Sequence, residues 1–126
     1  MSDQMMALLR AETREILLAA AQVIEVNGHF KGDYLDFDEI ERARWEEGAE
    51  LAWSDCPVCA YGAINIAACG QPNRLSDVGE LAAAAFAGHL GITPSGIGIW
   101  NDAPERTEAE VITSLRECAD SEEVSA

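Results

Sequence analysis

The chain has 126 residues, of which 48% are hydrophobic, and this is enough to bury a core in a single domain over 1–126 without disulfides. Acidic side chains outnumber basic ones by 23 to 8, for a formal net charge of -15. Such a charge repels nucleic acid and anionic membranes, and it attracts cations or basic protein surfaces. We therefore expect a protein partner with a basic surface, no direct nucleic-acid partner and no membrane partner. The alternative is that the acidity serves solubility alone.

No uninterrupted apolar run approaches the length of a membrane span, and the first residues, Met1 to Gln4, lack the basic segment of a signal peptide. We expect a cytoplasmic protein, in which the four cysteines are mostly reduced.

The first predicted element is a helix over 3–27. Leu9, Ile16 and Val23 recur at helical spacing on the side that we expect to face a central helix, and Gly28 supplies the stop. A connector over 29–36 follows. Asp38 and Glu41 then form a capping box, which predicts a second helix that extends through Trp45.

Residues 54–70 predict the central helix. Asp55 or Cys56 suits its N-cap, Pro57 fits the first turn, and Gly70 suits the other end. The side chains between these signals are apolar nearly all round, which is typical of a buried helix.

Within this helix Asn65 is the lone polar side chain, and Gly62 and Ala63 leave room for a neighbouring element to come close. We therefore expect a mainly α-helical, compact domain built around a buried central helix.

Another helix is predicted from Ser76 to a stop at Gly91. Ile97 and Ile99 then alternate with glycines before Trp100, a pattern that fits a short strand. Its partner would be the segment around 30–37, in a minor two-stranded β ribbon.

A second capping box, Thr107 with Glu110, opens the last predicted helix. Val111, Leu115 and Cys118 share its apolar face. The acidic tail at about 120–126 is expected to be disordered.

Cys56 and Cys59 have the spacing of a redox pair at a helix start, and they are also the only candidates for part of a zinc site. Against both hypotheses, Asp55 would raise a thiol pKa, and structural zinc needs four ligands. An incidental pair of core cysteines is the alternative that we favour, and we expect no metal and no cofactor.

Trp100, Asn101 and Asp102 place an aromatic side chain beside two polar ones. One interpretation is a pocket at this point, to which the buried amide of Asn65 also contributes. The other is that Trp100 belongs to the core while Asn101 and Asp102 form an Asx turn.

Acidic residues are concentrated between Asp33 and Asp55, where they are interleaved with two tryptophans. We expect an interaction surface here, and its members are Asp38, Glu39, Trp45, Glu46, Glu47, Glu50 and Trp53.

The run Cys59-x-x-Gly62-Ala63-Ile64 and the later Trp100-Asn101-Asp102 together resemble a family of small uncharacterised proteins of actinobacteria and their phages, a domain of unknown function. The resemblance covers nearly the whole chain. It implies a single cytoplasmic domain of a bacterium or phage, and it brings no activity with it. Val58 stands where the family often has tryptophan, and the position of Cys56 need not be cysteine.

These observations give three hypotheses. The leading one is an acidic protein-interaction module, such as a phage accessory protein that imitates the charge of DNA and binds a basic surface of a host protein. The second is a small-molecule-binding protein or enzyme with a site near Asn101 and Asp102. The third is redox chemistry or zinc binding at Cys56 and Cys59. Whether the protein is an enzyme is left open.

Overall fold

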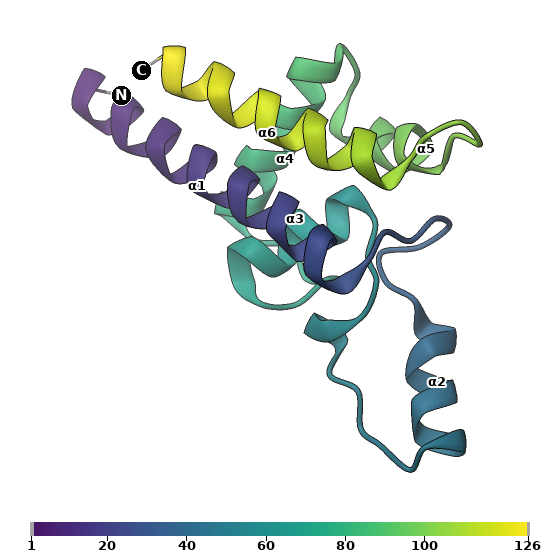
Figure 1. Cartoon of the computed structure of the whole chain (residues 1–126). Helices are drawn as coiled ribbons and strands as arrows, with labels where there is room; N and C mark the ends of the chain where they lie inside the picture. The colour runs from purple at the N-terminus through teal and green to yellow at the C-terminus, as the bar shows by residue number, and fades with distance from the viewer. Residues whose placement is uncertain (1, 126) are drawn as a thin grey trace.

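The computed structural model describes residues 2–125, with side chains described as far as residue 121. Within this range six α-helices and two 3₁₀ turns follow one another in the order α1 (Asp3–Asn27), α2 (Phe37–Glu46), η1 (Trp53–Asp55), α3 (Ala60–Cys69), α4 (Asp77–Leu90), η2 (Pro94–Gly96), α5 (Ile97–Asp102) and α6 (Glu108–Ser125). The buried core lies among α1, α3, α4 and α6 (Figure 1). The predicted mainly helical fold is therefore confirmed. None of the helices in the described part of the chain is long and apolar enough to cross a membrane.

α1 and α6 lie side by side and run antiparallel (Figure 1). Gly28 ends α1 as predicted. The capping box that opens α6 is also present, because Glu110 N–H donates to Thr107 Oγ1 at 3.1 Å and Thr107 N–H donates to Glu110 Oε1 at 3.3 Å. Arg116 on α6 pairs with Glu25 on α1. The local signals thus place the end of α1 and the start of α6 where the sequence predicts them.

The buried face of α1 is broader than the predicted stripe. Of that stripe, Ile16 is buried, whereas Leu9 and Val23 are only partly covered. The helix packs against both α6 and α3, so its buried face lies between these two neighbours and comprises Thr13, Ile16, Leu17, Ala20, Ala21 and Ile24.

The apolar face predicted for the last helix is confirmed, because Val111, Leu115 and Cys118 are buried. α6 continues to Ser125 and takes in most of the segment 120–126 that we expected to be disordered, while Ala126 lies outside the described residues.

α3 is the buried central helix, but the prediction of its start was wrong. Its N-cap is Cys59, and Pro57 lies in an extended segment before it. Val58 pairs with two parts of the preceding connector, in a parallel bridge to His29 and an antiparallel bridge to Leu35. These backbone hydrogen bonds hold residues 56–58 extended, so the helix can begin only after them.

The predicted ribbon between the 30–37 region and Ile97–Trp100 is also wrong. Residues 97–102 form the short helix α5, which follows directly on the turn that Pro94 begins. A strand would place Ile97 and Ile99 on the same face, yet Ile97 is fully buried and Ile99 is 80% exposed. The 30–37 region pairs instead with Val58.

α4 begins and ends where the sequence predicts. The side chain of Ser76 accepts from Gly79 N–H at the start, and Gly91 has a left-handed conformation at the end. Phe86 of this helix is fully buried in the core.

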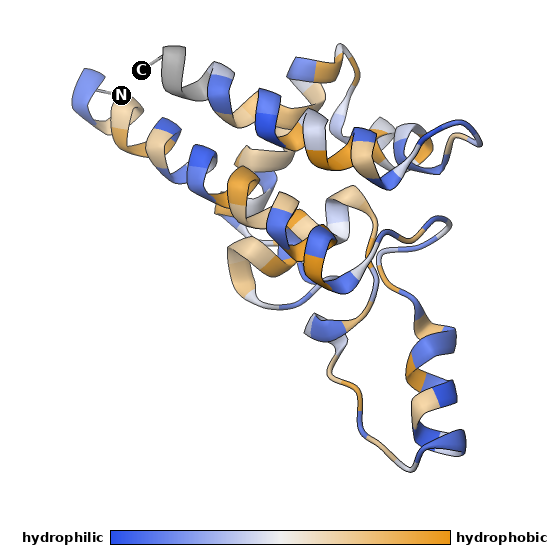
Figure 2. Ribbon diagram, viewed as in Figure 1, coloured by the Kyte–Doolittle hydropathy of each residue, from blue (hydrophilic) through white to orange (hydrophobic). Residues whose placement is uncertain are grey.

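α2 stands apart from the body of the molecule (Figure 1). Its residues are mostly hydrophilic (Figure 2). Its N-cap is Asp36 and not Asp38, because Asp36 Oδ1 accepts from Glu39 N–H at 3.1 Å. Ala43 is the only side chain of this helix that is buried.

Candidate functional site

A pocket of about 280 Å³ opens where three segments meet: the loop before α2, the first turn of α3, and the η2–α5 turn. This volume is just below the range of about 300–1,000 Å³ that is typical of ligand sites. Asp102 is the one residue of the predicted pocket that lines it. The full lining is Gly32, Asp33, Tyr34, Cys59, Tyr61, Pro94, Ser95, Gly98 and Asp102.

Two tyrosines form the aromatic part of the wall. The rings of Tyr34 and Tyr61 meet edge to face, with their centroids 5.9 Å apart. Burial raises the pKa of the Tyr61 hydroxyl above its usual value, and Tyr34 and Glu80 raise it further. The Tyr61 hydroxyl therefore stays protonated near neutral pH, and the pair presents two aromatic rings to the pocket.

Asn101 is fully buried and holds the three segments together. Its Oδ1 accepts from Ala60 N–H at 2.9 Å, and its Nδ2 donates to the carbonyl oxygen of Phe30 at 3.0 Å. His29 Nε2 lies 2.7 Å from the same Oδ1, so this nitrogen carries the proton. Because protein groups occupy both ends of the amide, Asn101 positions the pocket walls and does not line the pocket.

Asp102, the last residue of α5, faces the pocket and ties down the loop opposite. Its Oδ1 accepts from Gly32 N–H and from Asn101 Nδ2, each at 3.0 Å. Its other carboxylate oxygen has no hydrogen-bond partner among the described residues. The ammonium group of Lys31 donates to the carbonyl oxygen of Ala103 at 2.7 Å, which is a second contact between the same loop and the end of α5.

The other two residues of the predicted pocket lie elsewhere. Trp100 packs edge to face on Phe86 with a centroid distance of 5.5 Å, and the guanidinium carbon of Arg106 lies 4.2 Å from the Trp100 ring centroid. Asn65 is buried and donates to the carbonyl oxygen of Pro72 at 2.9 Å. Trp100 is thus a packing residue, and Asn65 holds the loop between α3 and α4.

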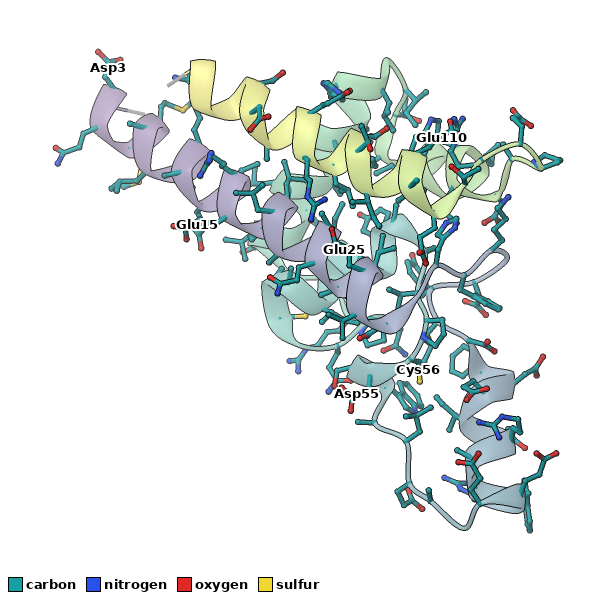
Figure 3. The ribbon with its side chains drawn as sticks, viewed as in Figure 1. Asp3, Glu15, Glu25, Asp55, Cys56 and Glu110 are labelled. Carbon is teal, nitrogen blue, oxygen red and sulfur yellow. The ribbon has the colours of Figure 1, made fainter. Side chains whose placement is uncertain are left out.

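Cys56 and Cys59 are free, buried thiols (Figure 3 labels Cys56). Cys56 Sγ donates to the carbonyl oxygen of Ala52 at 3.4 Å, and Cys59 Sγ accepts from Gly62 N–H at 3.3 Å. Burial is the main cause that raises both pKa values, and it raises that of Cys59 to about 11. A protonated thiol is a poor nucleophile, so this arrangement does not favour redox catalysis.

The described residues hold no group of three or more His, Cys, Asp or Glu side chains placed to bind a metal ion. Within that part of the chain, Cys56 and Cys59 therefore lack the further ligands that a structural zinc site requires.

The residues predicted to form an acidic surface lie on one lobe, which we call the acidic arm (residues 33–55). Some of its carboxylates are paired within the arm. Arg42 lies 2.6 Å from Glu47 Oε1 and 3.7 Å from Glu46 Oε2, and Arg44 lies 3.9 Å from Glu50 Oε1.

A hydrogen bond from Arg42 to Glu39 lowers the pKa of that carboxyl group. Asp38 and Glu41 are exposed and have no ion pair with the described residues.

The aromatic side chains of the acidic arm are unusually open. Trp45 is 78% exposed, and Trp53 is 41% exposed although it packs edge to face on Phe37 with a centroid distance of 5.6 Å. Asp55 and Cys56 mark the junction between the arm and the body of the molecule (Figure 3).

Sequence reasoning missed the aromatic half of the pocket. Tyr34 and Tyr61 fit the apolar pattern of their segments, which hides them among core residues. A tyrosine hydroxyl usually needs a partner or water, so each could have marked a position at the edge of the core.

Comparison with curated proteins and with solved structures gave no match. A protein-family model does match, and its match covers residues 9–121, which is most of the chain. The chain therefore belongs to the family of unknown function DUF6197.

Proposed function

We propose that the protein is an interaction module whose acidic arm docks on a basic surface of another protein, with Trp45 entering an apolar recess of that partner. The observation that carries the proposal is the 78% exposure of Trp45 on a helix that stands apart from the body. Tryptophan is enriched among the residues that dominate binding energies at protein interfaces. The exposed ring of Trp45 among carboxylates therefore supports a docking surface for a basic partner.

The charges of the acidic arm indicate the chemistry of the partner. Asp38 and Glu41, exposed and without an ion pair among the described residues, are available to lysine and arginine side chains of a partner. Glu39 and Glu47 are already engaged by Arg42. The net charge of -15 adds long-range attraction to any basic surface. The proposal favours a phage accessory protein as the role of this chain, with a host protein as its partner.

In the test, the whole protein is immobilised and used to capture partners from host lysate over a series of salt concentrations. The captured partner is then purified, and its affinity for the wild-type protein and for each variant is measured by titration. Trp45→Ser removes the exposed ring, and Val26→Ser is its control because Val26 on α1 is also 76% exposed. Asp38→Asn with Glu41→Gln removes two free charges from the arm. Glu12→Gln with Glu15→Gln removes the same charge from exposed positions on α1.

We expect the arm variants to weaken binding of the captured partner by about tenfold or more, as for loss of an interface hot spot. The α1 variants should bind as the wild type does. Rising salt should weaken the complex, because the free carboxylates are exposed. A partner that binds Trp45→Ser normally, or no specific capture at low salt, would overturn the proposal.

A second candidate function is binding of a small molecule in the pocket beside Asp102. The observation in its favour is the 280 Å³ cavity, whose walls are held in place by the hydrogen bonds of Asn101. Cys59 lines it with a protonated thiol, and no histidine lines it, so the pocket favours binding over nucleophilic catalysis.

A further inference from the structure

We propose that the pocket binds a primary alkylammonium group. This pocket lies between α3, α5 and the loop that precedes α2. The ammonium end would face Asp33 and Asp102, and the alkyl chain would lie along Tyr34 and Tyr61. This inference rests on the second candidate function, small-molecule binding at this pocket, and names its ligand class. It does not depend on the acidic arm being a docking surface.

The charges around the pocket select a cation. Asp33 and Asp102 are the charged residues of the lining, and both are acidic. Asp33 Oδ1 accepts from Tyr34 N–H and Asp102 Oδ1 accepts from Gly32 N–H, so each carboxylate is oriented by the loop. The second oxygen of each has no hydrogen-bond partner among the described residues. Lys31 is the only lysine of the sequence, and its ammonium group donates to the carbonyl oxygen of Ala103, in the backbone after α5.

An anion would find few donors in the same place. The first turn of α3 borders the pocket, and such a turn ordinarily offers free N–H groups to a negative charge. Here Ala60 N–H donates to Asn101 and Gly62 N–H donates to the sulfur of Cys59. These internal acceptors already use the donors at the helix start. The pocket therefore keeps its negative character although a helix N-terminus lies beside it.

The remaining walls suit a short alkyl chain. The edge-to-face rings of Tyr34 and Tyr61 give an aromatic surface, and Pro94 and Gly98 add further apolar atoms to the lining. Aromatic faces also attract cations directly. Ser95 adds a hydroxyl oxygen to the lining, so the pocket offers acceptors besides the two carboxylates to the three N–H bonds of a primary ammonium.

The probe is n-butylammonium, and its binding is followed by the amide NMR signals of the whole protein. Butyrate and n-butanol are the comparison ligands, because they have a similar size but carry a negative charge and no charge, respectively. We expect butylammonium to shift the amide signals of Gly32, Tyr34 and Gly98. Asp102→Asn keeps an acceptor for Gly32 N–H and removes the charge, so it should weaken binding about 10- to 100-fold. Asp33→Asn should act in the same way.

The matched control is Asp120→Asn, an exposed acid in the C-terminal half of α6 that does not line the pocket. It removes one charge from the protein but none from the residues that line the pocket. Binding should change less than about twofold, because Asp120 is exposed to solvent and its charge is screened by salt. Equal weakening in Asp102→Asn and Asp120→Asn would show a general charge effect and overturn the inference.

Two sources of the alkylammonium group are separated by comparing 1,5-diaminopentane with a terminally blocked tripeptide whose central residue is lysine. Tighter binding of the diamine supports a free amine as ligand, and tighter binding of the peptide supports a lysine side chain of another protein. If butyrate or butanol shifts the pocket signals and butylammonium does not, the ligand class is wrong but a small-molecule site remains. If none of the ligands shifts them, both the ligand class and the second candidate function fail.

Discussion

Gly62 in the middle of α3 is required by the close approach of the loop that carries Tyr34. A Cβ atom at this position would lie less than 3.0 Å from the carbonyl oxygen of Tyr34 and 3.2 Å from the Cβ atom of Val58. Cys59 N–H donates to the same carbonyl oxygen at 3.2 Å. The oxygen therefore cannot move away without loss of that hydrogen bond, and Gly62→Ala should destabilise the protein.

Two opposing effects set the magnitude. Alanine is favoured over glycine inside a helix by about 1 kcal/mol. Against this, overpacking a filled site costs about 1–3 kcal/mol, and loss of the hydrogen bond from Cys59 to Tyr34 costs about 1 kcal/mol. The net expectation for Gly62→Ala is a free energy of unfolding lower by about 1–3 kcal/mol.

Gly88 in α4 is the matched control. It is also a helical glycine without a positive φ, and nothing lies within 4 Å of a Cβ atom added there. Gly88→Ala should therefore raise the free energy of unfolding by about 0.5–1 kcal/mol. Urea unfolding followed by far-UV circular dichroism should separate the free energies of unfolding of the two variants by about 1.5–4 kcal/mol. If Gly62→Ala is as stable as Gly88→Ala, the reasoning about the contact with Tyr34 is refuted.

Two further predictions concern buried polar groups near the pocket. Asn101→Ala leaves the N–H of Ala60 without its acceptor, so it should lower the free energy of unfolding by about 2–4 kcal/mol. The control, Asn73→Ala at an exposed position, should change it by less than about 0.5 kcal/mol. Similar urea midpoints for the two variants would contradict this prediction. Burial raises the pKa of the Cys59 thiol to about 11. Iodoacetamide should therefore alkylate Cys59 near neutral pH more slowly than the partly exposed Cys69, as followed by peptide mass spectrometry. Equal alkylation rates in the native protein would contradict this prediction.

Several helix ends were predictable from local signals, although the predicted capping box of Asp38 and Glu41 was wrong because Asp36 is the N-cap of α2. Gly28, Ser76 and Thr107 each act through backbone groups within a few residues, and the structure places a helix end at each. The start of α3 was not predictable in this way. Pro57 suits a first turn, but pairing of Val58 with His29, 29 residues earlier, keeps the segment extended. A contact distant in sequence overrode the local preference.

The same distinction holds for the candidate site. Asp102 could be identified because a carboxylate at the end of an apolar segment is visible in the sequence. That Tyr34 and Tyr61 meet beside it follows from packing of three segments that are far apart along the chain. The exposed Trp45 was predicted as part of a contact surface, but only the structure shows that α2 leaves its ring uncovered.

The two proposed sites share one piece of chain. Asp33 and Tyr34 line the pocket and also begin the acidic arm, and the hydrogen bond between Cys59 and Tyr34 joins this junction to α3. A substitution at Asp33 therefore changes both sites at once. Asp102→Asn alters the pocket from α5 and Trp45→Ser alters the arm far from the pocket lining, so this pair separates the two functions. Loss of amine binding in the first variant alone, with loss of partner binding in the second alone, would establish two independent sites.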